Sequence, residues 1–350
     1  KEDEAMSYIQ EEVVFSNKDV TLAGTLTLPR TSGWHPAVVL LHGSGPLNRD
    51  HEFFGMKTFW IIADHLTRRG VAVLRYDSRG VGGSGGAPFQ FTLQDVAEDA
   101  LAAIRYLKTR KDINPAQIGL CGLSQGAIVA PIAASRSEDV AFIVCLAGIG
   151  VPGGEAHIAQ MISIARANGA SKQETEELVE NLKRIISLIR KEAKEAEIRP
   201  LITTMLKNQC VSMSQNSEKE TKEDDEAADA HIECVLSFYK SPWFRFFIDY
   251  EPKPALEQVM CPALFLFGEL DTQVPLEVNR TAIGEVLKKS GNNDYTLKMF
   301  PKANHAFQSA NTGSPSEYMS LEKKFVPGFL EIMSDWVLKR VDIVTQRDHL

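Results

Sequence analysis

The chain has 350 residues, of which 44% are hydrophobic and 24% are charged. These proportions are those of a globular protein with a large core, and the length suits one large α/β domain with an insertion or two ordinary domains. The net charge of −8 argues against nucleic acid or an anionic membrane as a partner, because both bind basic surfaces. No apolar stretch approaches the ~18 residues of a membrane span. The cysteine count of five is odd, and Cys121, Cys145 and Cys261 lie in or beside predicted strands, so we interpret these three as core residues and not as a disulfide framework.

Hydrophobic periodicity predicts strands that alternate with helices along most of the chain. The predicted strands, in chain order, are 12–15, 21–28, 37–41, 71–74, 117–121, 141–146, 263–267 and 295–299. The predicted helices outside the middle of the chain are 58–69, 93–109, a segment after residue 124, 276–289 and 327–340. Thr92 and Asp95 form a capping box at the second helix, and Pro327 is predicted in the first turn of the last. Such β-α-β alternation favours an α/β fold with a mostly parallel sheet and helices on both faces.

Residues 122–126 read Gly-Leu-Ser-Gln-Gly and lie between a predicted strand and a helix-prone segment. This pattern is typical of a sharp turn that exposes a serine hydroxyl at the end of a strand. The turn leaves no space for side chains at Gly122 and Gly126. Ser124 is therefore the candidate nucleophile. The backbone N–H of Gln125 is predicted to stabilise an oxyanion formed beside it.

Helical periodicity with almost no strand signal occupies the middle of the chain. We predict a helical lid at 151–255, inserted into a core formed by 1–150 and 256–350. The insertion ends in a cluster of aromatic residues between 238 and 250. Packing of the lid on the core is the plainer interpretation of these rings, because buried aromatics serve packing first. The alternative is that the rings of Trp243, Phe244 and Phe247 line a substrate pocket.

A serine nucleophile needs a histidine to accept its proton and a carboxylate to orient that histidine. In this arrangement the acid and then the histidine follow the serine in the chain, each after a later strand. Asp271 and His305 occupy these positions, each in the loop after a predicted strand. We therefore predict a triad of Ser124, Asp271 and His305. Glu269 and Glu155 are the competing carboxylates.

The second oxyanion donor is predicted in the loop after the strand at 37–41, where residues 42–46 read His-Gly-Ser-Gly-Pro. Glycines let the backbone of such a loop approach the substrate closely. Ser44 N–H is the predicted donor, with Gly45 as the alternative. His42 is predicted to have a structural role in holding the loop.

With these motifs the chain resembles an α/β-hydrolase over nearly all of residues 10–340. It is similar to lidded bacterial carboxylesterases that carry the His-Gly-Ser-Gly-Pro loop followed by a polar Asn-Arg-Asp, here residues 48–50. The same group has Arg-Tyr-Asp-Ser-Arg-Gly, here 75–80, and a lid that ends in Ser-Pro-Trp-Phe-Arg, here 241–245. The resemblance implies the same triad and oxyanion donors. It also implies hydrolysis of short-chain acyl esters through an acyl-enzyme.

The chain departs from that group at the serine turn. Leu123 and Gln125 stand where such esterases commonly have His and Glu, and Ala127 stands where Gly is common. Neither change alters the serine hydroxyl or the backbone N–H. We therefore expect a different pocket polarity and pH response with the mechanism retained.

The predicted function is a serine carboxylesterase that acts on a small-molecule ester without a cofactor or a metal. An acyltransferase and a serine peptidase or amidase are the alternatives on the same scaffold, and a binding module on an inactive scaffold is the alternative outside enzymes. The glycine-rich run 80–85 matches a dinucleotide-binding pattern, with Asp99 near the distance for a ribose contact. Pro88 and Phe89 separate this run from the next helix, so we do not expect nicotinamide binding. No His-Glu-x-x-His or paired Cys-x-x-Cys indicates a metal site.

The sequence begins at Lys1 without an initiator methionine or an apolar leader. We expect an exported bacterial protein whose signal peptide is absent from this chain, and a cytoplasmic protein is the alternative. The sequence predicts neither the oligomeric state nor the natural substrate.

Overall fold

The computed structural model describes residues 8–213 and 222–342. Its centre is an eight-stranded sheet in the order β1-β2-β6-β3-β7-β8-β9-β10, with β1 and β10 at the edges. The six strands β6, β3, β7, β8, β9 and β10 run parallel to one another, whereas β2 is antiparallel to both β1 and β6. The strands of this sheet are β1 (Tyr8–Asn17), β2 (Val20–Pro29), β3 (His35–Leu41), β6 (Ala72–Tyr76), β7 (Ile113–Leu123), β8 (Ile143–Leu146), β9 (Ala263–Gly268) and β10 (Tyr295–Phe300). The predicted mostly parallel sheet is confirmed.

Burial explains which strands are central. Every residue of β3 and of β6 is buried, as their continuous apolar runs predict for strands covered on both faces. The edge strand β1 instead alternates exposed and buried residues over much of its length. It joins β2 through a two-residue turn in which Lys18 has a φ of 52°. The predicted strands at 12–15 and 21–28 therefore belong to one β-hairpin.

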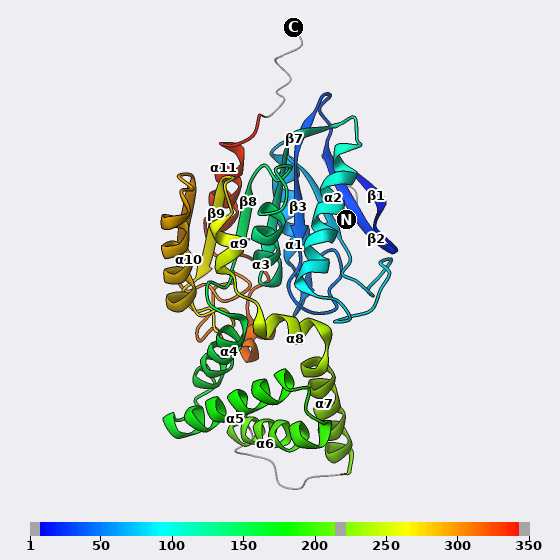
Figure 1. The fold of residues 1–350 in the computed structure, drawn as a ribbon. Coiled ribbons are helices and arrows are strands. Elements are labelled where there is room, and N and C mark those ends of the chain that lie inside the picture. The colour runs from blue at the N-terminus through cyan, green and yellow to red at the C-terminus, as the bar shows by residue number, and fades with distance from the viewer. Residues whose placement is uncertain (1–7, 214–221, 343–350) are drawn as a thin grey trace.

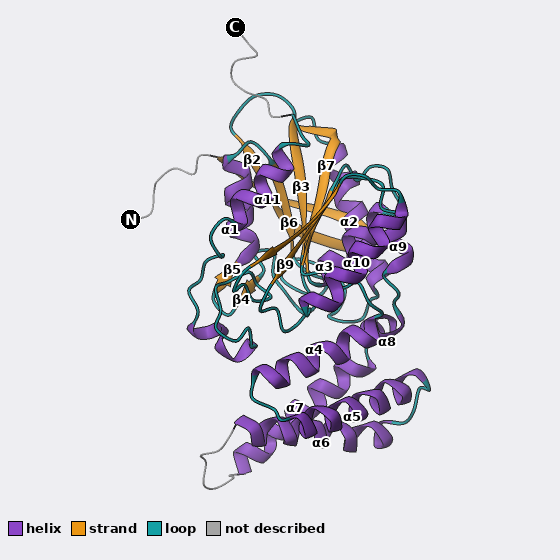
Figure 2. Ribbon diagram, turned by 90° about the vertical axis from the view of Figure 1, so that its left-hand side faces the viewer, coloured by secondary structure: helices purple, strands orange, loops and turns teal. Residues whose placement is uncertain are grey.

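Helices cover both faces of the sheet (Figure 2). On one face lie α1 (Thr58–Arg68) and α11 (Phe329–Leu338), and on the other lie α2 (Leu93–Lys108), α3 (Gln125–Ala134) and α10 (Leu276–Ser290). The shorter elements are β4 (Glu52–Phe53), β5 (Met56–Lys57), α9 (Lys253–Glu257) and the 3-10 helix η1 (Pro315–Ser320). No helix in the described ranges has the length and apolar character needed to cross a membrane.

The helix ends follow the capping chemistry of the sequence, with one exception. Thr92 and Asp95 form the predicted capping box at α2. The prediction that Pro327 lies in the first turn of the last helix is wrong. Gly328 is the N-cap of α11, with a φ of 80°, and the helix begins one residue later. Glycine adopts this left-handed conformation without a steric cost, so the chain turns at Gly328 and leaves Pro327 outside the helix.

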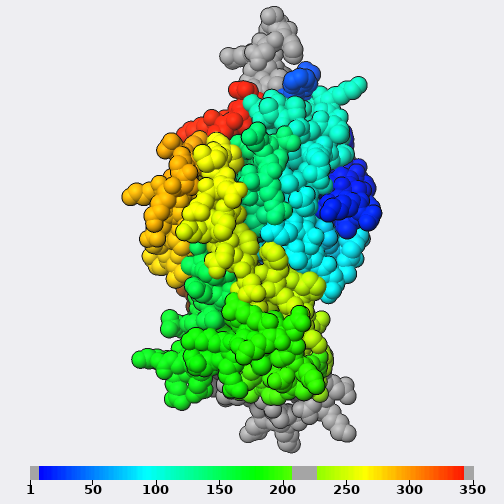
Figure 3. Space-filling view, viewed as in Figure 1, coloured from blue at the N-terminus to red at the C-terminus, as the bar shows by residue number. Residues whose placement is uncertain are grey.

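Five helices form a block at one end of the sheet (Figure 1), and Figure 3 shows that block packed directly against the core. They are α4 (Gly153–Ala167), α5 (Lys172–Arg190), α6 (Glu195–Met213), α7 (Lys222–Lys240) and α8 (Pro242–Asp249). The predicted lid boundary at residue 255 falls inside α9, which packs against α3 and α10 of the core. The helical character of this region is as predicted, and its role as a lid stays a prediction.

Candidate active site

Ser124 lies on a sharp turn between β7 and α3. Its backbone has φ 56° and ψ −111°, a conformation that non-glycine residues rarely adopt outside functional sites. The flanking glycines make the turn possible. A Cβ on Gly122 would lie 2.1 Å from the backbone of Gly126, and a Cβ on Gly126 would lie 1.9 Å from the carbonyl oxygen of Leu41. This close approach to Leu41 also brings the turn to the end of β3, where the predicted donor loop begins.

Ser124 lines a cavity of about 360 Å³ between the sheet core and the five-helix block. This volume lies in the range of small-molecule sites. Ser44 and Gln125 line the same cavity. The predicted pocket residues on α8 also line it, and they are Trp243, Phe244 and Phe247. The structure thus brings six of the predicted site residues to one cavity.

Asp271 and His305 lie side by side in the loops after β9 and β10, which are neighbours in the sheet. His305 Nδ1 is 2.9 Å from Asp271 Oδ2 and 3.0 Å from Oδ1, and both residues are buried. An ionised carboxylate only accepts hydrogen bonds, so this contact places a hydrogen on Nδ1 and leaves Nε2 as an acceptor. The backbone N–H groups of Gln273 and Val274 donate to Asp271 Oδ1 at 2.9 and 2.8 Å. These bonds fix the position of the carboxylate.

The two competing carboxylates lie away from the histidine. Glu269 accepts a hydrogen bond of 2.8 Å from the backbone N–H of Lys302 at an exposed position. Glu155 is exposed in the first turn of α4. Of the three candidates, Asp271 is the one in contact with His305.

Asn304 organises the loop that carries His305, and the sequence analysis did not single it out. The Asn304 side chain is buried, and its Oδ1 accepts hydrogen bonds from the backbone N–H groups of Ala306 at 3.0 Å and Gln308 at 2.9 Å. Phe307 has a φ of 56° in the same turn. The asparagine beside the candidate histidine was the available signal, because asparagine side chains commonly close such turns.

Within the described chain, no direct hydrogen bond joins Ser124 to His305. Such contacts are often long in the absence of substrate and shorten in the reactive complex. His51 lies near both Ser124 and His305 and so links the two parts of the site. His51 Nε2 accepts a hydrogen bond of 3.3 Å from the N–H of Gly43, and a Cβ on Gly43 would lie 3.6 Å from Ser124 Cβ. Burial, followed by the nearby rings of His42 and His305, lowers the pKa of His51 to about 3.

The loop that carries Ser44 is held by His51 and not through hydrogen bonds of His42. Neither ring nitrogen of His42 has a hydrogen-bond partner among the described residues, and the ring packs against Tyr76 with centroids 5.4 Å apart. The role of His42 in the loop is therefore one of packing. The backbone N–H of Ser44 has no acceptor in the part of the chain that the structure describes, so it is free to bind a ligand. Gly45, the alternative donor, has a φ of 119°, which favours glycine.

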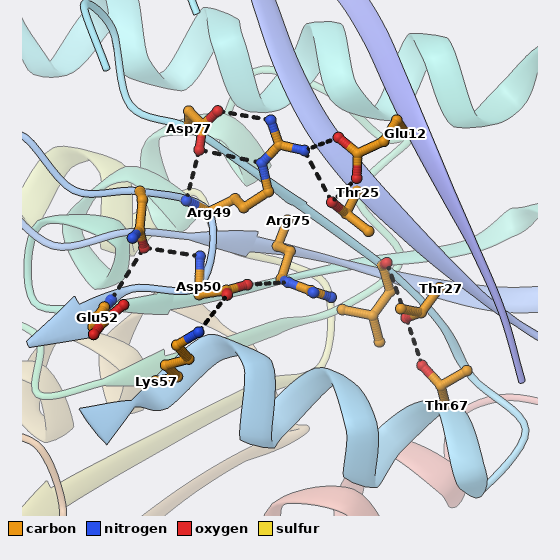
Figure 4. A network of polar contacts seen from close by, with 12 residues as sticks. Glu12, Thr25, Thr27, Arg49, Asp50, Glu52, Lys57, Thr67, Arg75 and Asp77 are labelled. Carbon is orange, nitrogen blue, oxygen red and sulfur yellow. Dashed lines mark hydrogen bonds and ion pairs between the residues drawn. The ribbon is translucent and has the colours of Figure 1, made fainter. Parts of the chain in front are cut away.

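Beyond Ser44 the loop enters an ion-pair network that joins it to the end of β6 (Figure 4). Arg49 binds the carboxylate of Asp77 through its backbone N–H at 2.9 Å, Nε at 3.2 Å and a terminal nitrogen at 2.8 Å. Asp50 accepts a hydrogen bond of 2.9 Å from Arg75 Nε, and Glu12 of β1 forms an ion pair with Arg49. The two polar motifs on which the family resemblance rested are thus the two halves of one network.

The glycine-rich run 80–85 packs around Asp77. A Cβ on Gly82 would lie 2.4 Å from Asp77 Oδ2. Asp99 binds Arg79 through two hydrogen bonds of 2.7 Å and Asn17 through a third of 2.7 Å. The glycines and the carboxylate of the dinucleotide-like pattern therefore have structural contacts here. Among residues 8–213 and 222–342, no cluster of three or more His, Cys, Asp or Glu side chains is placed to hold a metal ion.

Comparisons with known proteins agree with this architecture. Residues 38–317, most of the chain, match the Alpha/beta hydrolase family. Esterase EstD of Thermotoga maritima is 39% identical over 138 residues, which are 39% of this chain and 33% of that protein. The matched segment therefore spans about a third of that relative's length.

Two solved structures resemble the whole chain. The alpha/beta hydrolase GrgF from Penicillium sp. sh18 has a TM-score of 0.58 at 17% identity, with 95% of this chain and 99% of that chain covered. The proline iminopeptidase from Mycobacterium smegmatis has a TM-score of 0.57 at 15% identity, with 94% and 98% covered. Likeness at these identities shows the fold, which hosts several activities. From the family match and the sheet order together, the chain belongs to the alpha/beta hydrolase family.

Proposed function

We propose that this hydrolase is a serine carboxylesterase that cleaves small-molecule esters through an acyl-enzyme. The observation that carries the proposal is the contact of His305 Nδ1 with Asp271, in loops at the same end of the sheet as the strained Ser124 turn. The family match and the esterase name of the Thermotoga maritima relative support a hydrolase of this kind.

In the proposed reaction, Ser124 Oγ attacks the ester carbonyl carbon while His305 Nε2 accepts the hydroxyl proton. Asp271 holds the histidine in the required tautomer and stabilises the imidazolium. The backbone N–H groups of Ser44 and Gln125 bind the oxyanion of the tetrahedral intermediate. The C–O bond to the alcohol then breaks, and His305 gives its proton to the leaving alcohol. Water attacks the acyl-enzyme with His305 as the base, which releases the acid and restores Ser124.

We further propose that α4 to α8 act as a lid that limits the size of the substrate. The support is the position of α8, whose residues Trp243, Phe244 and Phe247 line the same cavity as Ser124. A lid over the strand ends also excludes water from the reacting groups, which strengthens their electrostatic interactions.

A substrate panel with matched variants tests the proposal. The panel contains p-nitrophenyl esters of graded acyl length, acetylated and feruloylated sugars, and aminoacyl amides. We expect ester hydrolysis by the native protein, and a loss of at least about a thousand-fold in Ser124→Ala. The control is Ser237→Ala, an exposed serine on α7. A fluorophosphonate probe is expected to label the Ser124 peptide. Unchanged activity in Ser124→Ala, or faster cleavage of amides than of esters, would contradict the proposal.

A further inference from the structure

The side chain of Gln125 makes two contacts that the sequence did not predict. Gln125 follows the candidate nucleophile at the start of α3, and it is buried with 3% of its surface exposed. Its Oε1 accepts a hydrogen bond of 2.6 Å from Trp243 Nε1 on α8. Its Nε2 donates a hydrogen bond of 3.4 Å to the carbonyl oxygen of Gly43. One amide thus connects the five-helix block to the loop after β3.

The chemistry of tryptophan fixes the orientation of this amide. The indole N–H is a donor and never an acceptor, so the group that faces Trp243 must be the amide oxygen. The NH₂ group therefore faces Gly43, where a carbonyl oxygen is the matching acceptor. Exchanging the two ends of the Gln125 amide would oppose donor to donor at one contact and acceptor to acceptor at the other.

The carbonyl of Gly43 and the N–H of Ser44 belong to the same peptide group. In a planar trans peptide these two bonds point in opposite directions, so a hydrogen bond that holds the oxygen also sets the direction of the N–H. The preceding peptide is held in turn, because the N–H of Gly43 donates to His51 Nε2. Gly43 itself has no side chain to restrict rotation. The direction of Ser44 N–H therefore depends on these two outside contacts.

Trp243 is well placed to anchor this link. Its ring stacks on Phe247 with centroids 5.0 Å apart and an interplanar angle of 15°. Its backbone N–H donates to the carbonyl oxygen of Phe89 at 3.3 Å, and its ring also contacts Phe238 of α7. The indole is therefore fixed by neighbours from both the core and the five-helix block.

We propose that the Gln125 side chain is a positioning residue that aligns Ser44 N–H as an oxyanion donor, and that Trp243 acts through it. Gln125 then contributes to both oxyanion donors. Its own backbone N–H is one donor, and its side chain orients the other, Ser44 N–H, by binding the carbonyl oxygen of Gly43. The position of α8 on the core is thereby coupled to the geometry of the oxyanion site. This inference rests on the proposed esterase function.

Three variants separate the contacts. Gln125→Met keeps the side-chain length and the backbone N–H but removes both hydrogen bonds. Gln125→Glu keeps an acceptor for Trp243 and removes the donor to Gly43. Trp243→Phe keeps an aromatic ring and removes the indole N–H. For both Gln125 variants we expect kcat to fall about ten- to a hundred-fold, less than the loss of a whole donor, with KM changed less than threefold.

Two readouts distinguish positioning from a general structural role. A trifluoromethyl ketone, which forms an oxyanion on the serine, should bind the Gln125 variants more weakly in proportion to kcat/KM. A ground-state competitive inhibitor should bind them as it binds the native protein. Since Trp243 acts through Gln125, a double variant that combines Gln125→Met with Trp243→Phe should lose no more kcat than Gln125→Met alone. Met260→Leu, a change of similar volume at an exposed position outside the cavity, is the control, and its kcat should stay near the native value.

A crystal structure of Gln125→Met gives an answer independent of activity. A rotated or doubly populated Gly43–Ser44 peptide supports the inference, and an unchanged peptide overturns it. Native kcat and native ketone affinity in both Gln125 variants also overturn it. If the native protein hydrolyses no ester, the proposed function fails, and the peptide orientation in the variant structure still decides the positioning role.

Discussion

Arg49 and Asp77 join the loop after β3 to the end of β6 through three hydrogen bonds to one carboxylate. Burial disfavours the charge on Asp77, but hydrogen bonds from Arg49 and from the backbone N–H of Gly83 outweigh it and lower the pKa of Asp77. Arg49→Met leaves this charge without its main partner, so we expect the free energy of unfolding to fall by about 2 kcal/mol. Urea denaturation measures this change, and kcat should fall as well because Ser44 lies on the same loop.

The control for Arg49→Met is an exposed ion pair. Lys183 and Glu180 are 3.1 Å apart on the outer surface of α5, with both side chains more than half exposed. Lys183→Met should cost less than about 1 kcal/mol. Equal costs for the two variants would contradict the structural role of the Arg49–Asp77 pair.

Asp271→Asn tests the orientation of the histidine. The amide presents no carboxylate to His305 Nδ1, so the ring loses the tautomer that leaves Nε2 free to accept the serine proton. We expect kcat for ester hydrolysis to fall by about ten thousand-fold, with the fold intact by circular dichroism. Glu269→Gln is the matched control on the same loop and should keep the native kcat. A larger loss in the Glu269 variant would identify Glu269 as the acid instead.

Three buried histidines predict a loss of stability in mild acid. Burial is the main cause that lowers the pKa of His42 to about 4, of His51 to about 3 and of His157 to about 4. Because these values lie below the ordinary 6.5, the unfolded chain binds more protons than the folded one between pH 6.5 and about 4. Stability is therefore full above pH 6.5 and falls as the pH drops, by up to about 1.4 kcal/mol per pH unit for each histidine.

Urea denaturation at pH 7.5, 6.0 and 5.0 measures this dependence. His157→Phe removes one of the three groups from a site where it contacts Tyr239 and Phe244. In this variant the slope should fall by less than a third, because burial also lowers the pKa values of His35 and His65. A free energy of unfolding that stays constant from pH 7.5 to 5.0 would contradict the prediction.

Phe247→Ala tests whether α8 limits the size of the substrate. Phe247 lines the cavity and stacks on Trp243, so its truncation enlarges the cavity that Ser124 also lines. We expect relative kcat/KM for longer acyl groups to rise about tenfold, the scale set by one or two methylene groups in an apolar pocket. Phe246→Ala is the control, because Phe246 lines a different hollow on the other side of α8. An unchanged chain-length preference in Phe247→Ala would contradict the proposed lid.

The parts of the fold that could be predicted are those that depend on local sequence. Continuous apolar runs predict β3 and β6, and the capping box of Thr92 and Asp95 marks the start of α2. The predicted triad and oxyanion residues come soon after strands, where the chain order alone indicates their position. The start of α11 is one local feature that was predicted wrongly. Proline at a first turn and glycine at an N-cap are both common, and periodicity does not choose between them.

The contacts that support the site could not be predicted, because they join residues far apart in the chain. Trp243 lies 118 residues from the amide that it binds in Gln125. The fit between Gln125 and Gly43 likewise depends on how α3 meets the loop after β3. No local pattern marks His51 as the acceptor for Gly43, since its role follows from a left-handed backbone and a buried position. Such contacts become visible once the chain is folded.

The position of β10 at the edge of the sheet has a consequence for the order in which parts of the protein unfold on heating. His305 follows this strand, which is hydrogen-bonded in the sheet to β9 alone, whereas Ser124 follows β7 between two neighbours. An edge strand can detach in a partial opening that leaves the central strands paired. Amide exchange should therefore be faster along β10 than along β7. If His305 and Ser124 act together as proposed, activity should be lost on gentle heating before the sheet melts.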